Sequence, residues 1–523
     1  MALRREGPLG VEGEGEQMID PISIAMFVAL FIVFVFLGFY GARWRKGDLT
    51  KLTEWGLAGK NIGAFLGWFL LGADIYTAYT FIAVPSSLFA KGSIYFFAAP
   101  YVIITYAFAM WAMPKFWKIA NKRGYITVAD FTREVFNSRL LAISVAIVGI
   151  VAELPYIALQ IVGMQAVLIA LLQGFGATQT IIELSLIVSF IILAAFTWTS
   201  GLRGATLGAL LKDALILVSV VAVVVAVATL GDFHTAFVNA SATTVHYFQL
   251  PANLYNAYWS LFVFSALALY LYPHVINGSL AQTDPKTVRK TASLLPLYSI
   301  GLAFLAMFGF MIYGVPAALN YVHSFPASVQ GTQVVPGLIL TLLPSWLSGA
   351  ALLGIFIGGL VPAAIMAIAA ANLFTRNIAK EINPKITPKG ETRIAQVFAV
   401  VFKFLALGFV FVIPLTYAIQ LQLFGGILIL QILPAFIFGM ITRKLNRRAL
   451  FLGLLAGVVS GVYMMEAANN YAQWATTLIG TGLGPVFIGM IALAINIIIV
   501  VAGTLVANAM NVTNDLRKDV LLD

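Results

Sequence analysis

The chain lacks cysteine altogether and carries few charged residues. The absence of thiols excludes disulfides, thiolate metal sites and cysteine nucleophiles. Charged side chains make up 10% of the residues, against about 25% in soluble globular proteins, so a soluble fold is excluded too. The sequence also has no phosphate-binding glycine loop, no zinc-binding HExxH and no serine-based triad. We therefore expect neither an enzyme nor an ATP-driven pump, and no organic cofactor.

The sequence instead consists largely of long apolar runs. Hydrophobic residues make up 61% of the chain, and a helix needs about 20 apolar residues to cross a bilayer. The pattern predicts an all-α polytopic membrane protein with about thirteen transmembrane helices. The candidate spans are about 22–42, 62–89, 94–118, 139–173, 179–199, 206–230, 252–275, 293–316, 349–378, 392–413, 415–441, 448–466 and 484–509. Spans four and nine are too long for one untilted crossing, so we expect them to be tilted, kinked or extended.

The basic residues are segregated along the chain. Most of the 31 lysines and arginines fall in the loops after every odd-numbered span or in the C-terminal tail, whereas the other loops hold only Lys91. Such segregation follows the positive-inside rule, and it accounts for the net charge of +10 without a nucleic-acid partner. It predicts a multi-pass protein of the cell (plasma) membrane, with the N-terminus outside and the C-terminus in the cytoplasm.

Little of the chain lies outside the spans. The Gly- and Glu-rich tail Met1–Asp20 is expected to be disordered and extracellular, and residues 21–523 to form one transmembrane domain. The first apolar run follows a polar tail rather than a basic region, so we expect a retained span and not a signal peptide. The segment Thr127–Phe136 starts with a suitable N-cap, Thr127, and its amphipathic pattern predicts a short interfacial helix.

The most informative residue is Asp74, in the middle of the second span. A charge at the centre of a membrane costs about 2.5–3.5 kcal/mol even on lenient scales, so it is retained where it pairs or functions. The hydroxyls of Tyr76 and Thr77 follow it, and Pro85 lies beyond. This composition is typical of a broken helix that lines a site. One hypothesis is a cation- or proton-linked role, and the other is a structural carboxylate satisfied by backbone amides.

Two more ionisable residues lie inside spans. Glu153 precedes Pro155, which predicts a kink; the segment either lines the substrate path or is a packing helix near the outer interface. Lys403 lies near the middle of span ten. It could pair with Asp74 or Glu153, hold a substrate carboxylate, or act as a fixed cation in place of a bound ion.

Two other ionisable residues lie near the ends of predicted spans. Asp213 follows Lys212 at the predicted cytoplasmic start of span six, which favours a structural or gating ion pair. His274, at the predicted inner end of span seven, is either structural or a proton relay.

Four separated segments resemble the sodium:solute symporter family, and within it the branch of monocarboxylate permeases that import small acids such as lactate and pyruvate. They read LLGADIYTAYTFIAVP (Leu70–Pro85), LPYIALQIVG (Leu154–Gly163), LYLYPHVING with RKTASLLPLYS downstream (Leu269–Ser299), and LVPAAIMAIAAANLFTRNI (Leu360–Ile378). The resemblance implies an inverted five-helix repeat of the leucine-transporter type. Repeat one would cover about 62–230 and repeat two about 252–441, with additional helices at 22–42, 448–466 and 484–509. It further implies broken helices around Gly72–Ile75 and near Phe264–Leu267.

The resemblance also implies a sodium site, formed by carbonyls of Gly72 and Ile75 and by span nine. The family supplies a small residue and two hydroxyl residues there, but this chain has Ala364 followed by Ala367 and Ile368. Hard cations take oxygen ligands, so two ligands are missing. Either Asp74 ligates the sodium ion directly, or Asp74 with Lys403 handles a proton. The sequence leans towards proton coupling or sodium independence.

A monocarboxylate needs hydrogen-bond donors. The candidates are the amides of the broken helix and five side chains: Tyr76, Thr77, Tyr79, Gln160 and Lys403. The expected function is import of a lactate- or pyruvate-like acid by alternating access, coupled to a proton or sodium gradient. One alternative is a symporter of the same fold for an amino acid or a pantothenate-like acid. Another is a membrane sensor or scaffold with a vestigial transport fold.

Overall fold

The computed structural model describes residues 20–45, 47–172, 176–242, 248–410, 418–442, 444–470 and 476–512. The N-terminal tail that we expected to be disordered lies outside these residues, apart from Asp20.

Within the described part of the chain, twelve helical segments are long and apolar enough to cross a membrane. They are Pro21–Tyr40 (α1), Ser93–Arg123 (η3 and α5), Arg139–Leu172 (α7), Gln179–Ser200 (α8), Leu202–Leu230 (α9), Ala252–Leu271 (η5 and α11), Pro285–Gly314 (α13, η6, α14 and η7), Ser345–Ile382 (α18, η9 and α19), Pro388–Val410 (α20), Ala418–Ile441 (α21, η11, η12 and α22), Arg447–Ala468 (α23) and Ile488–Ala509 (α24). Each of these segments corresponds to one predicted span. The second predicted span has no counterpart among them.

The second predicted span exists, but it is broken. It consists of α3 (Ala64–Ala73), the π-helical turn η2 (Tyr79–Ala83) and α4 (Val84–Lys91). The prediction of a broken helix around Asp74 is therefore confirmed.

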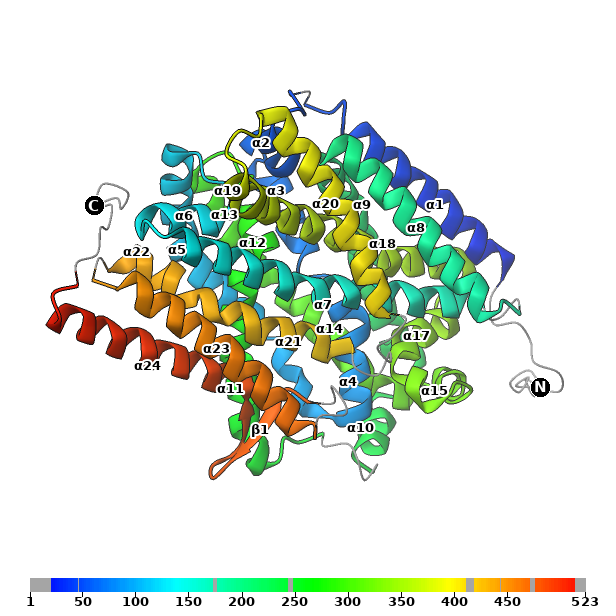
Figure 1. The fold of residues 1–523 in the computed structure, drawn as a ribbon. Helices are drawn as coiled ribbons and strands as arrows, with labels where there is room; N and C mark the ends of the chain where they lie inside the picture. The colour runs from blue at the N-terminus through cyan, green and yellow to red at the C-terminus, as the bar shows by residue number, and fades with distance from the viewer. Residues whose placement is uncertain are drawn as a thin grey trace, which may run out of the picture.

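The core of the molecule is formed by α18 (Ser345–Phe374), whose most apolar stretch is buried completely. It packs against α7 and α9 over much of its length, and also against α1 and α20. In Figure 1, α1 and α8 lie at one edge of the molecule, and the paired helices α23 and α24 lie at the opposite edge. The breaks described below lie in helices that contact this core.

Short elements lie at the two ends of the helices. The predicted interfacial helix is present as α6 (Val128–Val135), and Thr127 is its N-cap in a capping box with Asp130. At the same end of the molecule lie α2 (Leu52–Leu57) and α19 (Lys380–Ile382), as Figure 1 shows. This is the end that the basic loops predict to be cytoplasmic.

The opposite end holds structure that the sequence did not lead us to expect. An antiparallel hairpin, β1 (Leu478–Thr481) and β2 (Gly484–Phe487), precedes α24. Gly484 has φ +98°, a conformation that favours glycine. The other short helices are α10 (Phe233–Ala242), α15 (Pro316–His323), α16 (Ala327–Gln330), η8 (Gly331–Gln333) and α17 (Val334–Leu342).

The second break is not where we predicted it. Helix α11 (Tyr255–Leu271) continues through Phe264–Leu267, and the chain breaks at Tyr272 before α12 (Pro273–Leu280). Tyr272 has φ −58° and ψ 136°, an extended conformation. Proline disfavours helical geometry in the residue before it and has no N–H to continue the ladder. Pro273 therefore accounts for the position of the break.

Candidate functional site

The first break lies between α3 and η2, at Asp74–Thr77. The carbonyl of Gly72 accepts hydrogen bonds from the amides of Ile75 and Tyr76, at 3.0 and 2.9 Å. The carbonyl of Ile75 accepts from the Thr77 amide at 3.1 Å and from the Thr80 hydroxyl. The two carbonyls that we predicted as sodium ligands thus already accept bonds within the turn.

Asp74 is at the centre of this break and is 1% exposed. Neither carboxylate oxygen has a hydrogen-bond partner within the described residues. Four ionisable groups act on it electrostatically: His274, Lys212, Glu153 and Asp213. A buried carboxylate without a partner is costly, so Asp74 is the clearest functional candidate in the molecule.

The charges nearest to the break carbonyls come from α9. Lys212 Nζ donates to the carbonyls of Ala73 and Tyr76, at 3.1 and 2.7 Å. It also forms an ion pair with Asp213, with 2.8 Å between Nζ and Oδ1, and both side chains are fully buried. The other Asp213 oxygen accepts from the Tyr298 hydroxyl at 2.7 Å.

The predicted ion pair of Asp213 is therefore present, but its predicted position was wrong. Helix α9 begins at Leu202, so the pair lies about three turns inside the helix and not at its cytoplasmic start. The signal that we overlooked is Gly201, which ends α8 with φ +57° and lets the next helix begin at once.

The second break is held by Glu153, from the middle of α7. Its Oε1 accepts from the backbone amide of His274 at 3.0 Å, and the two carboxylate oxygens lie 2.9 and 3.0 Å from His274 Nδ1. Both side chains are fully buried. Glu153 therefore satisfies the start of α12 and does not lie near the outer interface.

Tyrosine rings fill the space around the two breaks. The rings of Tyr156 and Tyr272 lie 5.2 Å apart, and Tyr156 lies 5.5 Å from His274. Asp74 acts electrostatically on Tyr106 and Tyr156. The hydroxyls of Tyr79, Tyr106 and Tyr156 are buried and have no hydrogen-bond partner within the described residues. Our sequence reasoning missed two of these residues as site candidates: Tyr106 is a lone tyrosine in an apolar span, and Tyr156 lies within the segment Leu154–Gly163 but was not singled out there.

Three of the predicted substrate donors have partners within the protein. The Tyr76 hydroxyl donates to the Tyr298 carbonyl at 3.1 Å, and Thr77 Oγ1 accepts from the Tyr79 amide at 3.1 Å. Gln160 accepts from the Ala78 amide at 3.0 Å and donates to the Tyr156 carbonyl at 3.2 Å. Gln160 thus ties α7 to the first break.

Lys403, on α20, is set apart from this cluster. It is fully buried, and its Nζ has no hydrogen-bond partner within the described residues. No ion pair joins it to Asp74 or Glu153 there, and no ionisable group acts on it. The structure therefore does not bring Lys403 to either break.

The three span-nine residues of the predicted sodium site lie on α18. Ala364, Ala367 and Ile368 are fully buried, and their side chains carry no oxygen. They add no side-chain ligand for a cation.

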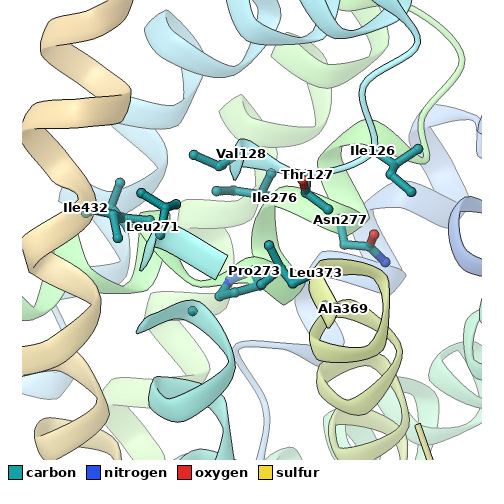
Figure 2. Close-up of a pocket in the computed structure, with 12 residues that line it drawn as sticks. Ile126, Thr127, Val128, Leu271, Pro273, Ile276, Asn277, Ala369, Leu373 and Ile432 are labelled. Atoms are coloured by element: carbon teal, nitrogen blue, oxygen red, sulfur yellow. The ribbon is translucent and has the colours of Figure 1, made fainter. Parts of the chain in front are cut away.

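A small cavity lies beside the second break, on the side of α6. Figure 2 shows Pro273, Asn277, Ala369 and Leu373 around it, with Thr127 at its edge. Its volume of about 20 Å³ is comparable with the space of one water molecule and is too small for an organic acid.

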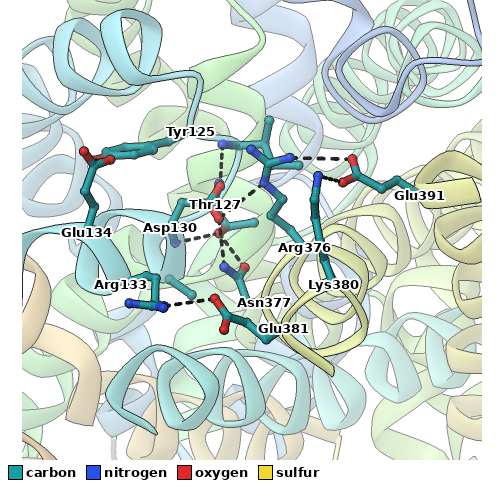
Figure 3. A network of polar contacts seen from close by, with 12 residues as sticks. Tyr125, Thr127, Asp130, Arg133, Glu134, Arg376, Asn377, Lys380, Glu381 and Glu391 are labelled. Carbon is teal, nitrogen blue, oxygen red and sulfur yellow. Dashed lines mark hydrogen bonds and ion pairs between the residues drawn. The ribbon is translucent and has the colours of Figure 1, made fainter. Parts of the chain in front are cut away.

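Beyond the cavity, a polar network that we did not predict joins α6 to the end of α18 and the start of α20 (Figure 3). Asp130 accepts from Asn377 at 2.8 Å and pairs with Arg376 at 3.6 Å. Arg376 also pairs with Glu391 at 3.5 Å, and Lys380 pairs with the same carboxylate.

Two further ion pairs extend the network. Arg133 and Arg139 both pair with Glu381, at 2.9 and 3.3 Å. At its margin, burial and a hydrogen bond to Glu134 raise the pKa of Tyr125. Residues that interact across such long sequence separations leave no local pattern, which is why the sequence did not reveal them.

Comparisons with known proteins agree with this architecture. The model of the sodium:solute symporter family matches residues 55–457. A monocarboxylate transport permease protein of Rhizobium johnstonii (strain DSM 114642 / LMG 32736 / 3841) is 40% identical over 498 residues, which cover 92% of this chain and 96% of the relative. The uncharacterized symporter YodF of Bacillus subtilis (strain 168) is 33% identical over 456 residues, covering 85% and 89%.

The structure of a Na⁺-coupled sialic acid symporter, in a substrate-bound outward-open state, has a similar fold. It superposes with a TM-score of 0.73 at 12% identity, over 93% of this chain and 98% of that one. The predicted fold class, an inverted-repeat transporter of the leucine-transporter type with broken helices, is confirmed. The chain belongs to the sodium:solute symporter family, whose members are transporters and not enzymes.

Proposed function

We propose that the chain is a secondary active symporter that imports a small monocarboxylate, similar to lactate or pyruvate, by alternating access. The proposal rests first on the relative that covers 92% of the chain and is named a monocarboxylate transport permease. It rests also on the chemistry of the two breaks, which the following paragraphs develop.

The observation that carries the proposal is the unbalanced charge of Asp74. Lys212 pairs with Asp213, and His274 pairs with Glu153, but neither oxygen of Asp74 has a hydrogen-bond partner within the described residues. An anionic substrate that enters this site brings a second negative charge into a buried region. Two close carboxylates cannot both stay ionised there without compensation. A proton or a metal cation that enters with the substrate would supply this compensation, and the two would then be transported together.

The substrate carboxylate would be held by the unpartnered hydroxyls of Tyr79, Tyr106 and Tyr156. Each is a buried donor without a partner within the described residues, and two of them lie within the electrostatic reach of Asp74. Binding would satisfy these donors, which removes the cost of leaving a buried polar group unpaired. The remaining predicted donors, Tyr76, Thr77 and Gln160, would keep the shape of the first break.

The test is uptake of labelled lactate and pyruvate into proteoliposomes, with proton and sodium gradients imposed separately. We expect saturable accumulation above the external concentration under at least one gradient. Uptake that equilibrates without exceeding the external concentration would contradict coupled transport. Failure of both acids, with accumulation of an amino acid, would move the proposal to another solute.

A further inference from the structure

The ammonium group of Lys212 lies at the first break, against the carbonyls of the residues that directly follow Gly72 and Ile75, the two predicted sodium ligands. Three oxygens lie 2.7–3.1 Å from Nζ, namely the Ala73 and Tyr76 carbonyls and Asp213 Oδ1. An ammonium group has three N–H donors; here it donates to the two carbonyls, and the Asp213 carboxylate balances its charge as an ion pair. Carbonyl oxygens that project from a helix end, together with one carboxylate, are the ligands that hard cations take in broken membrane helices.

Apart from the Asp74 carboxylate, the predicted ligands of a sodium ion at this break are already bonded or carry no side-chain oxygen. The Gly72 and Ile75 carbonyls accept hydrogen bonds within the turn, and Ala73 and Tyr76 accept from Lys212. Ala364, Ala367 and Ile368 on α18 offer no side-chain oxygen. A sodium ion at these carbonyls would also lie beside a buried ammonium group, and like charges repel strongly where water is excluded.

We propose that Lys212 is a covalently tethered replacement for the coupling sodium ion, so that this chain binds and transports its solute without sodium. The part of this inference that concerns transport rests on the proposed function. It states that sodium is the cation that the symporter does not need. The lysine supplies the positive charge that holds α3 and η2 in their broken arrangement. Asp213 balances that charge, and Tyr298 holds Asp213 in place.

The first test uses the purified wild-type chain and does not require a substrate. Binding of radiolabelled sodium is measured, and thermal stability is compared in sodium, potassium and choline chloride at equal ionic strength. We expect no saturable sodium binding and no stabilisation specific to sodium. Saturable sodium binding, or a rise in Tm in sodium that choline does not reproduce, would overturn the proposal.

The second test measures lactate or pyruvate uptake after choline replaces sodium on both sides of the membrane. Wild-type uptake should change by less than about twofold. Lys212→Met removes the charge but keeps the length of the side chain, and we expect it to lower uptake at least about tenfold. The matched control is Lys290→Met, which removes an exposed lysine on α13 and should transport like the wild type. Uptake by Lys212→Met at the wild-type rate would overturn the proposal.

Lys212→Met leaves the Asp213 carboxylate buried without its partner, which could prevent folding. Lys212→Met/Asp213→Asn removes both charges and avoids that cost. We expect the double variant to fold and still to transport at least about tenfold more slowly. If the double variant transports normally, the lysine has no role in transport.

The outcomes separate this inference from the proposed function. If neither acid is taken up under any condition, the proposed function fails, and the substrate-free sodium measurements still decide the role of Lys212. If uptake depends strictly on sodium, the proposed function stands and the inference fails. Accumulation driven by a proton gradient in choline supports both.

Discussion

The two helix breaks are satisfied by opposite charges from neighbouring helices. At the first, α3 ends, and the ammonium group of Lys212 donates to the carbonyl of its last residue, Ala73, and to that of Tyr76 in the break. At the second, α12 begins and the carboxylate of Glu153 faces the amide of His274. A cation thus lies at a helix C-terminus and an anion at a helix N-terminus, which is the pairing that helix dipoles favour.

The two breaks differ in which buried polar atoms remain without a partner after this pairing. Glu153 also pairs with Nδ1 of the His274 ring. Of these two side chains, only His274 Nε2 lacks a hydrogen-bond partner within the described residues. At the first break, Asp74 keeps two buried oxygens without a partner within the described residues. From this comparison we propose that the second break mainly maintains structure and that the first performs the coupling, and the variants below test this.

The sharpest way to test this comparison is to neutralise Asp74. Asp74→Asn removes the charge that we expect a cation or proton to balance, while both side chains have the same shape. We expect gradient-driven accumulation to fall by at least about tenfold, with no loss of Tm, because no hydrogen bond of Asp74 is broken. The assay is uptake in proteoliposomes together with the Tm of the purified protein.

Asp48→Asn is the control for this variant. Asp48 lies in a loop, where hydrogen bonds from the Thr50 side chain and amide lower its pKa, and its replacement should leave uptake unchanged. Normal accumulation by Asp74→Asn would remove Asp74 from the coupling mechanism.

At the second break, Glu153→Leu should have the opposite profile. It leaves the His274 amide and ring nitrogen unpaired in a buried region, at a cost of about 1–3 kcal/mol for each group. We expect a clear fall in Tm and in the amount of folded protein. Glu153→Gln keeps one acceptor for the amide and should recover most of the stability. The comparison of the breaks would be wrong if Glu153→Leu were stable but uncoupled.

The tyrosines near the breaks allow a matched pair of variants. Tyr272 donates to the Gln422 carbonyl at 3.0 Å, whereas the neighbouring Tyr156 hydroxyl has no partner within the described residues. Tyr272→Phe should cost about 1 kcal/mol of stability. Tyr156→Phe should leave Tm unchanged and raise the KM of the carboxylate substrate severalfold. If Tyr156→Phe leaves KM unaltered, this hydroxyl does not hold the substrate.

We predicted the position of the first break correctly from the sequence, but we placed the second one wrongly. Asp74 stands out because a charge in an apolar run is rare, and the surrounding hydroxyls mark the same place. The second break has no charge within the helix, and we placed it by its resemblance to other transporters. The local signal was Pro273, which is incompatible with a helical Tyr272.

The role of Lys212 could not be read from the sequence for a different reason. Its partners, Ala73 and Tyr76, are more than 130 residues away and contribute backbone oxygens, which have no side-chain signature. For Lys403, the predicted pairing with Asp74 or Glu153 is absent from the described residues, whereas its predicted roles toward a substrate carboxylate or as a fixed cation stay predictions. Hydropathy reports the depth of a residue, but only the packing of helices decides what faces it.

The smallest effect is expected from Asp284, which has the same task as Glu153 at a partly exposed site. It caps α13 (Pro285–Leu294) by accepting from the amides of Lys286 and Thr287, at 2.8 and 2.9 Å. Hydrogen bonds from the side chain and amide of Thr287 lower the pKa of Asp284 to about 2. Because the lowered pKa belongs to the folded state, this contribution is complete above the usual aspartate pKa of about 3.9 and is lost as the pH falls towards 2.

Asp284→Ala should therefore lower stability by about 1 kcal/mol or less, equally at pH 5 and pH 8, because the carboxylate is ionised at both. Water can replace the lost hydrogen bonds at this partly exposed site, whereas the side chains of Glu153 and His274 are fully buried. Thermal unfolding of the two variants at both pH values measures the difference. If Asp284→Ala lost as much stability as Glu153→Leu, burial would not decide how much these caps contribute. The contrast between the structural break and the coupling break would then lose its physical basis.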